Sequence, residues 1–124
     1  MPLYTAITED GFVSDDKKAK IAKEITRIHT TVMKVPNNFV RVVFLSYPKG
    51  SGFAAGEQAS TAALKCVLRS GHTDADKSEM LKQLWSMFQT TTGIPTDQLA
   101  ISLQETSSSN AMEMGQIMPS VGHK

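Results

Sequence analysis

The chain has 124 residues, a formal net charge of +1, 40% hydrophobic residues and a single cysteine, Cys66. The balanced charge and the lack of a basic run argue against nucleic acid or an anionic membrane as partner. One cysteine excludes an intrachain disulfide, and no apolar run is long enough to span a membrane. Glu9 and Asp10 come too early for a signal peptide. These features predict one small, soluble, cytoplasmic domain.

The chain begins with a proline directly after the initiator methionine. Residues 3–8 alternate between apolar and polar side chains, which predicts a short strand that ends at a turn over residues 9–11. If Met1 is removed, Pro2 becomes a secondary amine, and an α-amino group titrates at about pH 7.7–8.0. A modest decrease of its pKa would make it a base at neutral pH. Alternatively, Pro2 only favours methionine removal and ends the strand.

The next element predicted is an amphipathic helix of about five turns. Ser14 is its expected N-cap, and the helix ends before Val35-Pro36 because the residue before a proline resists helical geometry. Its apolar stripe consists of Ile21, Ile25, Ile28 and Val32. Residues 39–45 form a nearly continuous apolar run, which predicts a strand buried on both faces. Residues 47–56 are expected to be a loop.

The second half of the chain repeats this pattern. Residues 61–68 are strand-like, Thr73 and Asp76 resemble a capping box, and Gly93 is the expected C-cap of a second helix. Leu99, Ile101 and Leu103 alternate with polar residues and predict a fourth strand. Residues 107–109 are expected to be a flexible bend, and residues 110–114 a single helical turn.

The repeat predicts the architecture. Gly11, Asp16 and Lys17 recur sixty residues later, and Val35-Pro36 recurs at nearly the same offset as Ile94-Pro95. Two tandem β-α-β units of this kind predict an α/β (α+β) fold, in which a four-stranded mixed sheet carries both helices on one face. The boundaries are a single domain over 1–124, with repeats over about 2–50 and 60–106 and a C-terminal segment over 107–124. Another subunit is expected to cover the other face of the sheet.

Four short motifs in this order resemble the tautomerase superfamily, and within it the branch typified by cis-3-chloroacrylic acid dehalogenase. They are Pro2-Leu3-Tyr4, Ile28-His29, Leu68-Arg69-Ser70-Gly71, and the segment from Met112 to Gly115 with Met118-Pro119 and Gly122-His123. The resemblance implies a tautomerase/MIF-like fold, a homotrimer, and an active site around the N-terminal proline without metal or organic cofactor. The implied substrate is a small carboxylic acid.

The resemblance also assigns roles to residues. Pro2 corresponds to the catalytic proline, which acts as a base in tautomerase members and as a charged acid in dehalogenase and hydratase members. His29 corresponds to a helix histidine that helps to place substrate or water. Arg69 corresponds to the first of two arginines that hold the substrate carboxylate. Glu113 corresponds to the acidic residue that activates or orients water.

Two positions depart from the family pattern. His72 stands where the second carboxylate-binding arginine is expected, and Ser102 where a tyrosine of the last strand is expected. Imidazole cannot form the two parallel hydrogen bonds by which a guanidinium binds a carboxylate. These changes disfavour dehalogenation, and decarboxylation is left as a further alternative. The sequence therefore predicts a cofactor-independent tautomerase or hydratase that acts on a small 2-oxo or unsaturated acid.

Each of these residues also has a purely structural interpretation. His29 lies at the edge of the apolar helix stripe and could serve packing alone, whereas Arg69 and His72 could be ordinary surface and turn residues. Glu113 lies in a methionine-rich segment and could simply point to solvent. The altered positions leave open a second function, that of a non-catalytic binding or signalling protein on the trimeric tautomerase fold.

Overall fold

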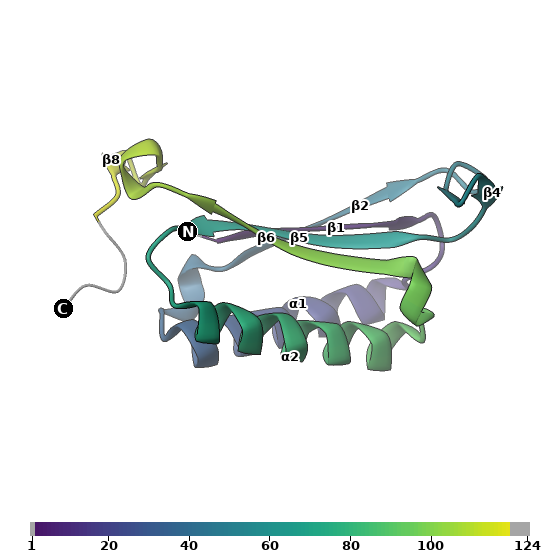
Figure 1. Ribbon diagram of the computed structural model, residues 1–124, viewed down its shortest axis with the longest axis horizontal. Coiled ribbons are helices and arrows are strands. Elements are labelled where there is room, and N and C mark those ends of the chain that lie inside the picture. Colours follow the sequence, from purple (N-terminus) through teal and green to yellow (C-terminus); the bar gives the residue numbers. More distant parts are fainter. Residues whose placement is uncertain (1, 120–124) are drawn as a thin grey trace.

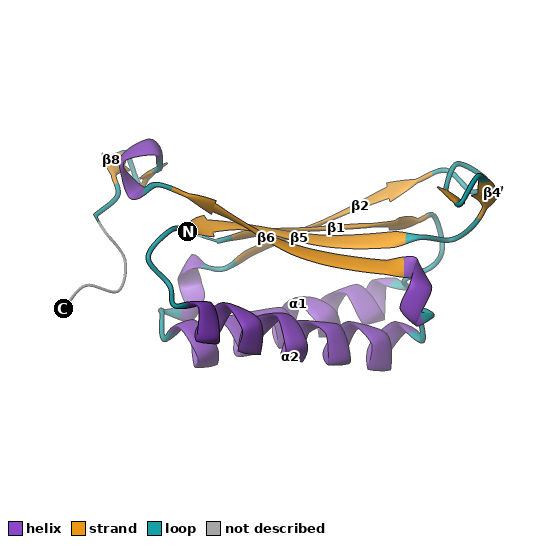
Figure 2. Cartoon of the chain, in the orientation of Figure 1, coloured by secondary structure: helices purple, strands orange, loops and turns teal. Residues whose placement is uncertain are grey.

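The computed structural model of the protein describes residues 2–119. Two helices form one layer, and they lie side by side across one face of a four-stranded sheet that forms the other layer (Figures 1 and 2). Together these elements form the predicted α+β architecture. The elements of the two layers are β1 (Leu3–Glu9), α1 (Asp15–Met33), β2 (Arg41–Tyr47), β5 (Ala62–Arg69), α2 (Asp74–Thr92) and β6 (Leu99–Thr106).

Both long helices begin and end where local chemistry predicts. The hydroxyl of Ser14 accepts a hydrogen bond from the Lys17 amide, and the hydroxyl of Thr73 accepts one from the Asp76 amide. These bonds satisfy amide groups that have no partner within the helix. At the other end of α2, Gly93 adopts a left-handed conformation with φ of 73° and closes the helix. The predicted caps are therefore confirmed.

The sheet has the order β2-β1-β5-β6, and each β-α-β unit contributes a parallel pair. The two units meet at the antiparallel pair of β1 and β5, in which Tyr4 lies opposite Cys66. The two helix caps are fifty-nine residues apart, whereas the turn glycines Gly11 and Gly71 are sixty apart. One residue is thus missing from the connection that precedes α2. Asp16 and Asp76, which match in the sequence, therefore lie at different positions relative to the N-caps of their helices.

The helices cover one face of the sheet, and the other face is open in the single chain. Tyr4, Leu64 and the apolar stripes of both helices form the buried core. On the open face, Leu3 is 42% exposed and Leu45 is 53% exposed. The prediction that the strand near residues 39–45 is buried on both faces is wrong for the isolated chain, because β2 is an edge strand whose alternate residues face outward.

Two short hairpins were not predicted. In the first, β3 (Phe53–Ala54) pairs with β4 (Glu57–Gln58), and in the second, β7 (Met112–Glu113) pairs with β8 (Gln116–Ile117). The second hairpin replaces the helical turn expected over residues 110–114. A 3₁₀ turn, η3 (Ser108–Asn110), precedes it, and similar turns, η1 (Asn37–Phe39) and η2 (Thr96–Gln98), precede β2 and β6. Within residues 2–119 no helix combines the length and apolar character that crossing a bilayer requires.

The two hairpins lie at opposite ends of the sheet (Figure 1). The β7–β8 hairpin is at the end where the chain begins, and the β3–β4 hairpin is at the far end. The N-terminal end of the sheet is also where β5 finishes, α1 finishes and α2 begins. The start of β1, the end of α1 and the connection from β5 to α2 thus lie at the same end of the sheet.

Candidate active site

A small recess lies at the end of the sheet where β1 begins and β5 ends. Four of the six predicted site residues line it, and they come from three segments of the chain, since Arg69 and His72 are only three residues apart. Pro2 precedes β1, His29 lies in the last turns of α1, Arg69 ends β5, and His72 lies just before α2. The remaining lining residues are apolar: Val35, Phe39 and Leu68. The fold therefore brings Pro2, His29, Arg69 and His72 together.

Pro2 is buried and is attached to the sheet through its carbonyl oxygen. The Arg41 amide donates a hydrogen bond to that oxygen over 3.0 Å, which continues the pairing of β1 with β2 by one residue. A proline nitrogen has no hydrogen to donate to the sheet. The part of Pro2 that remains for chemistry is therefore the ring and its nitrogen, at the edge of the recess.

His29 is buried, with 1% of its surface exposed, and within residues 2–119 it is hydrogen-bonded at one nitrogen. Its Nδ1 lies 2.7 Å from the hydroxyl oxygen of Tyr4, and the two rings meet edge to face at 5.6 Å between centroids. Burial, with a smaller contribution from the neighbouring His72, lowers the pKa of His29 to about 4. The imidazole is therefore neutral at physiological pH.

Arg69 makes the recess cationic on the side of α2, where His72 also lines it. The Nη1 of Arg69 donates a hydrogen bond of 2.8 Å to the carbonyl oxygen of Pro119, which ties the C-terminal segment to the end of β5. The other guanidinium N–H groups have no partner among the described residues. Both residues lie directly before the N-terminus of α2, where the helix dipole favours an anion.

His72 is half-buried, and its ionisation depends on mixed neighbours. Burial is the largest effect and lowers its pKa; the cations Arg69 and Lys77 act in the same direction. The carboxylates of Glu105 and Asp76 oppose this shift. Near neutral pH His72 is thus mostly a neutral hydrogen-bonding group, and Arg69 is the permanent cation of the recess.

The apolar wall of the recess was not predicted. Val35 and Phe39 come from the connection between α1 and β2, and Leu68 is the residue before Arg69. The Val35-Pro36 pair gave the signal for a chain reversal there, but nothing in the sequence placed this connection next to Pro2. In the single chain the recess measures about 20 Å³, enough for about one water molecule. A bound acid would require a wider opening.

The other two predicted residues lie elsewhere. Ser102 is exposed on β6 opposite Lys65, on the open face of the sheet. Glu113 is half-buried in β7, where it pairs with Gln116. Neither lines the recess of the single chain. The matching positions Gly122-His123, and Met1, lie outside the described residues.

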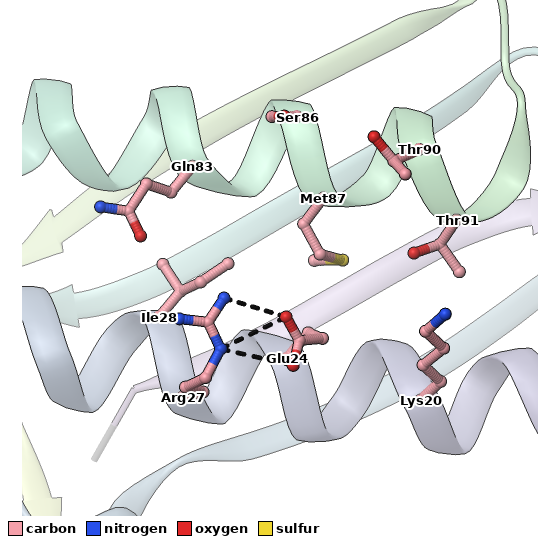
Figure 3. A pocket seen from close by; sticks show the side chains of 9 residues that line it. All are labelled: Lys20, Glu24, Arg27, Ile28, Gln83, Ser86, Met87, Thr90 and Thr91. Carbon is pink, nitrogen blue, oxygen red and sulfur yellow. Dashed lines mark hydrogen bonds and ion pairs between the residues drawn. The ribbon is translucent and has the colours of Figure 1, made fainter.

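The larger hollow of the molecule is a groove between α1 and α2, on the side away from the sheet (Figure 3). It measures about 410 Å³ and contains no predicted site residue. Its charged side chains include an ion pair of 2.9 Å between Arg27 and Glu24, with Lys20 one turn earlier (Figure 3). The Glu24 carboxylate is already paired with Arg27, and the groove lies at an open surface, so size alone does not make it the functional site. No three His, Cys, Asp or Glu side chains within residues 2–119 are grouped to hold a metal.

Comparison with known families explains this convergence. The family model described as "Putative oxalocrotonate tautomerase enzyme" matches residues 1–124. The chain belongs to this tautomerase family. The predicted membership of the tautomerase superfamily is thereby confirmed, and the protein is an enzyme of the tautomerase (isomerase) type. A comparison with curated proteins found no match.

Solved structures share the fold of this tautomerase. The native protein Ps01740 matches with a TM-score of 0.87 and 29% identity, over 90% of this chain and 99% of that chain. N1, a member of the cis-3-chloroacrylic acid dehalogenase family, matches with a TM-score of 0.89 and 24% identity, over 97% and 85%. A fused 4-OT described as a symmetric trimer matches with a TM-score of 0.85 and 17% identity, over 94% of each chain.

Proposed function

We propose that this tautomerase acts without a cofactor on a small 2-oxo or unsaturated carboxylic acid, with the nitrogen of Pro2 as the group that transfers the proton. The observation that carries the proposal is the convergence of Pro2, His29, Arg69 and His72 on one recess from three segments of the chain. A ring nitrogen, a neutral imidazole and a cation at the start of a helix are the groups that enol chemistry on an acid requires.

The proton transfer follows from this arrangement. Arg69 holds the substrate carboxylate, with His72 as a weaker second contact. In the tautomerase reaction the neutral Pro2 amine takes the proton of the enol hydroxyl, and the electron pair of the O–H bond stays on oxygen as an enolate. That pair then forms the carbonyl while the carbon–carbon π electrons take the same proton back from Pro2, so no atom is gained or lost. Arg69 and His29 stabilise the negative charge on oxygen between these two steps.

Hydration of an unsaturated acid is the second form of this chemistry. A protonated Pro2 would then donate its proton to carbon while water adds to the adjacent carbon, and Glu113 would orient that water. Glu113 is not among the residues that line the recess, so this form has less support than the tautomerase reaction. The tautomerase reaction needs only groups that line the recess, namely Pro2, His29, Arg69 and His72.

The enzyme is proposed to work as a homotrimer in the cytoplasm. The open sheet face exposes large apolar side chains that a monomer would leave in water, among them Leu3, Val43, Leu45 and Val67. The fused 4-OT of the same fold is described as a trimer. Packing of this face against other copies would also bring Ser102, which lies on it, into an interface.

The decisive experiment compares Pro2→Ala with the unchanged enzyme. Conversion of the enol of a short 2-oxo acid, followed by ultraviolet absorbance, is expected to slow about a hundredfold or more, since a primary amine in a mobile backbone replaces a fixed secondary amine. Intact mass must first show that Met1 has been removed, because an acylated nitrogen is no base. Full activity of Pro2→Ala would refute the role of Pro2.

A chemical probe tests the same nitrogen independently. 3-Bromopyruvate combines a 2-oxo acid with a leaving group, so a nucleophilic amine beside Arg69 should displace bromide and retain the three-carbon acid. Mass spectrometry of the N-terminal peptide is expected to show one such adduct on Pro2, formed together with loss of activity. Modification elsewhere in the chain, with Pro2 unmodified, would contradict the proposal.

A further inference from the structure

A cluster of buried groups lies behind His29 and has no assigned role. Tyr4 is fully buried in the middle of the core, directly behind His29. Its hydroxyl oxygen lies 2.7 Å from Nδ1 of His29 and 3.4 Å from Sδ of Met80. The thiol of Cys66, which is opposite Tyr4 on β5, also interacts with this hydroxyl. These contacts determine which nitrogen of His29 carries the proton.

A buried hydroxyl must donate its hydrogen to an acceptor, because water cannot reach it. The candidate acceptors are the imidazole Nδ1 of His29, the thioether of Met80 and the sulfur of Cys66. Both sulfur atoms are only weak acceptors, whereas an unprotonated imidazole nitrogen is a good one. The distance of 2.7 Å is also typical of a bond donated by O–H, since bonds donated by N–H are usually about 2.9–3.0 Å. The Tyr4 hydroxyl thus donates to Nδ1.

Cys66 fits the same assignment. Burial raises the pKa of its thiol to about 12, so sulfur keeps its hydrogen, and a protonated thiol is only a weak donor or a weak acceptor towards the Tyr4 hydroxyl. The Tyr4 hydroxyl itself stays protonated, because burial raises its pKa far above the usual range. Every polar atom of the cluster then has a compatible role, with the proton of the neutral His29 on Nε2.

We infer that Tyr4 is a positioning residue that holds His29 in the Nε2–H tautomer, so that His29 is a hydrogen-bond donor to the recess and not a base. The inference deepens the proposed function and rests on it only for the consequence in catalysis. Nε2 has no partner among the described residues, and His29 lines the recess. A donor at this point suits the oxygen of a substrate carbonyl or enolate, and it leaves Pro2 as the group that accepts the proton.

The tautomer can be measured in the resting enzyme without any substrate. Nitrogen-15 NMR of the imidazole distinguishes a nitrogen that bears hydrogen from a bare one, and a His29→Gln variant assigns the signals. The expected result at pH 7 is hydrogen on Nε2 of His29 and none on Nδ1. Hydrogen on Nδ1 would overturn the inference, since His29 would then donate to Tyr4 and Tyr4 to Met80. That result would leave the role of Pro2 intact.

Two matched variants separate positioning from packing. Tyr4→Phe keeps the ring and removes the donor, so the preference for the Nε2–H tautomer is expected to weaken and kcat/KM to fall about tenfold. Met80→Leu removes the competing acceptor but keeps the Tyr4 hydroxyl, so the tautomer and kcat/KM are expected to stay unchanged. If Tyr4→Phe fails to fold, the NMR result on Met80→Leu still decides, because a changed tautomer there would overturn the inference.

Discussion

The two β-α-β halves are built from the same elements in the same order, but they place different side chains at equivalent positions. Counted from the helix caps, His29 in α1 corresponds to Phe88 in α2, and both are buried. Counted back from the strand ends, Tyr4 in β1 corresponds to Leu64 in β5. A hydrogen-bonded polar pair in the first half thus replaces an apolar pair in the second. The polar pair is the one that adjoins the recess.

The strand ends differ in the same way. β1 ends at Glu9 and β5 ends at Arg69, and the antiparallel pairing of β1 with β5 puts these two residues at opposite ends of the sheet. The Glu9 carboxylate accepts hydrogen bonds from the Ser60 hydroxyl at 2.7 Å and the Gly50 amide at 3.2 Å. Within residues 2–119, Arg69 donates one hydrogen bond, from Nη1 to the carbonyl oxygen of Pro119. The Glu9 carboxylate thus stabilises a loop, whereas the Arg69 guanidinium keeps N–H groups that can bind a ligand.

The most severe test of this comparison places histidine at Phe88, the apolar counterpart of His29. Phe88→His would bury an imidazole within the apolar core, without a tyrosine to donate to it, and is expected to lower the free energy of unfolding by about 4 kcal/mol. Urea unfolding measures the change. Phe88→Leu is the control and should cost about 1 kcal/mol, because it loses contacts but adds no polar group. Equal costs for both variants would contradict the comparison.

The pH dependence of stability tests the polar position itself. The pKa of His29 is about 4 in the folded protein and about 6.5 in an unfolded chain, so between these values only the unfolded state binds the proton. The free energy of unfolding is therefore expected to fall by about 3 kcal/mol as the pH decreases from 6.5 to 4. His29→Phe, which copies the second half, should remove most of this slope. A slope unchanged in the variant would show that other groups cause it.

The two strand-end charges provide the third test. Arg69→Ala removes the fixed cation of the recess, and kcat/KM for a 2-oxo acid is expected to fall about fiftyfold through loss of the carboxylate contact. The counterpart Glu9→Gln changes charge at the far end of the sheet and should leave kcat/KM unchanged. Arg69→Lys should recover only part of the loss, because an ammonium cannot grip a carboxylate with two parallel bonds. Similar losses in Glu9→Gln and Arg69→Ala would indicate a general electrostatic effect.

The helices and long strands could be predicted because their signals are local. Ser14, Thr73 and Gly93 mark helix ends through the chemistry of single residues. The hairpins could not be predicted in this way, because their two-residue strands are too short to show alternation. Their turns place Ala55 and Met114 in left-handed conformations, with φ of 52° and 54°, where asparagine or glycine would be the usual signal.

The site was predicted through family resemblance more than through pattern. The sequence supplied Pro2, His29, Arg69 and His72, and the fold brings these four together. Tyr4 was missed as the partner of His29 because the pairing depends on how α1 packs across β1, which strand alternation alone does not fix. Ser102 and Glu113 are not among the residues that line the recess, so their roles stay predictions.

The attachment of Pro2 has a consequence for how the mature enzyme arises. Its bond to the Arg41 amide uses the carbonyl oxygen, on the far side of the residue from the nitrogen. An aminopeptidase that trims the preceding residue would cut on the nitrogen side and leave this anchor untouched. β1 would keep its register when the nitrogen of Pro2 becomes a free amine. The chain can therefore fold before or after this cleavage.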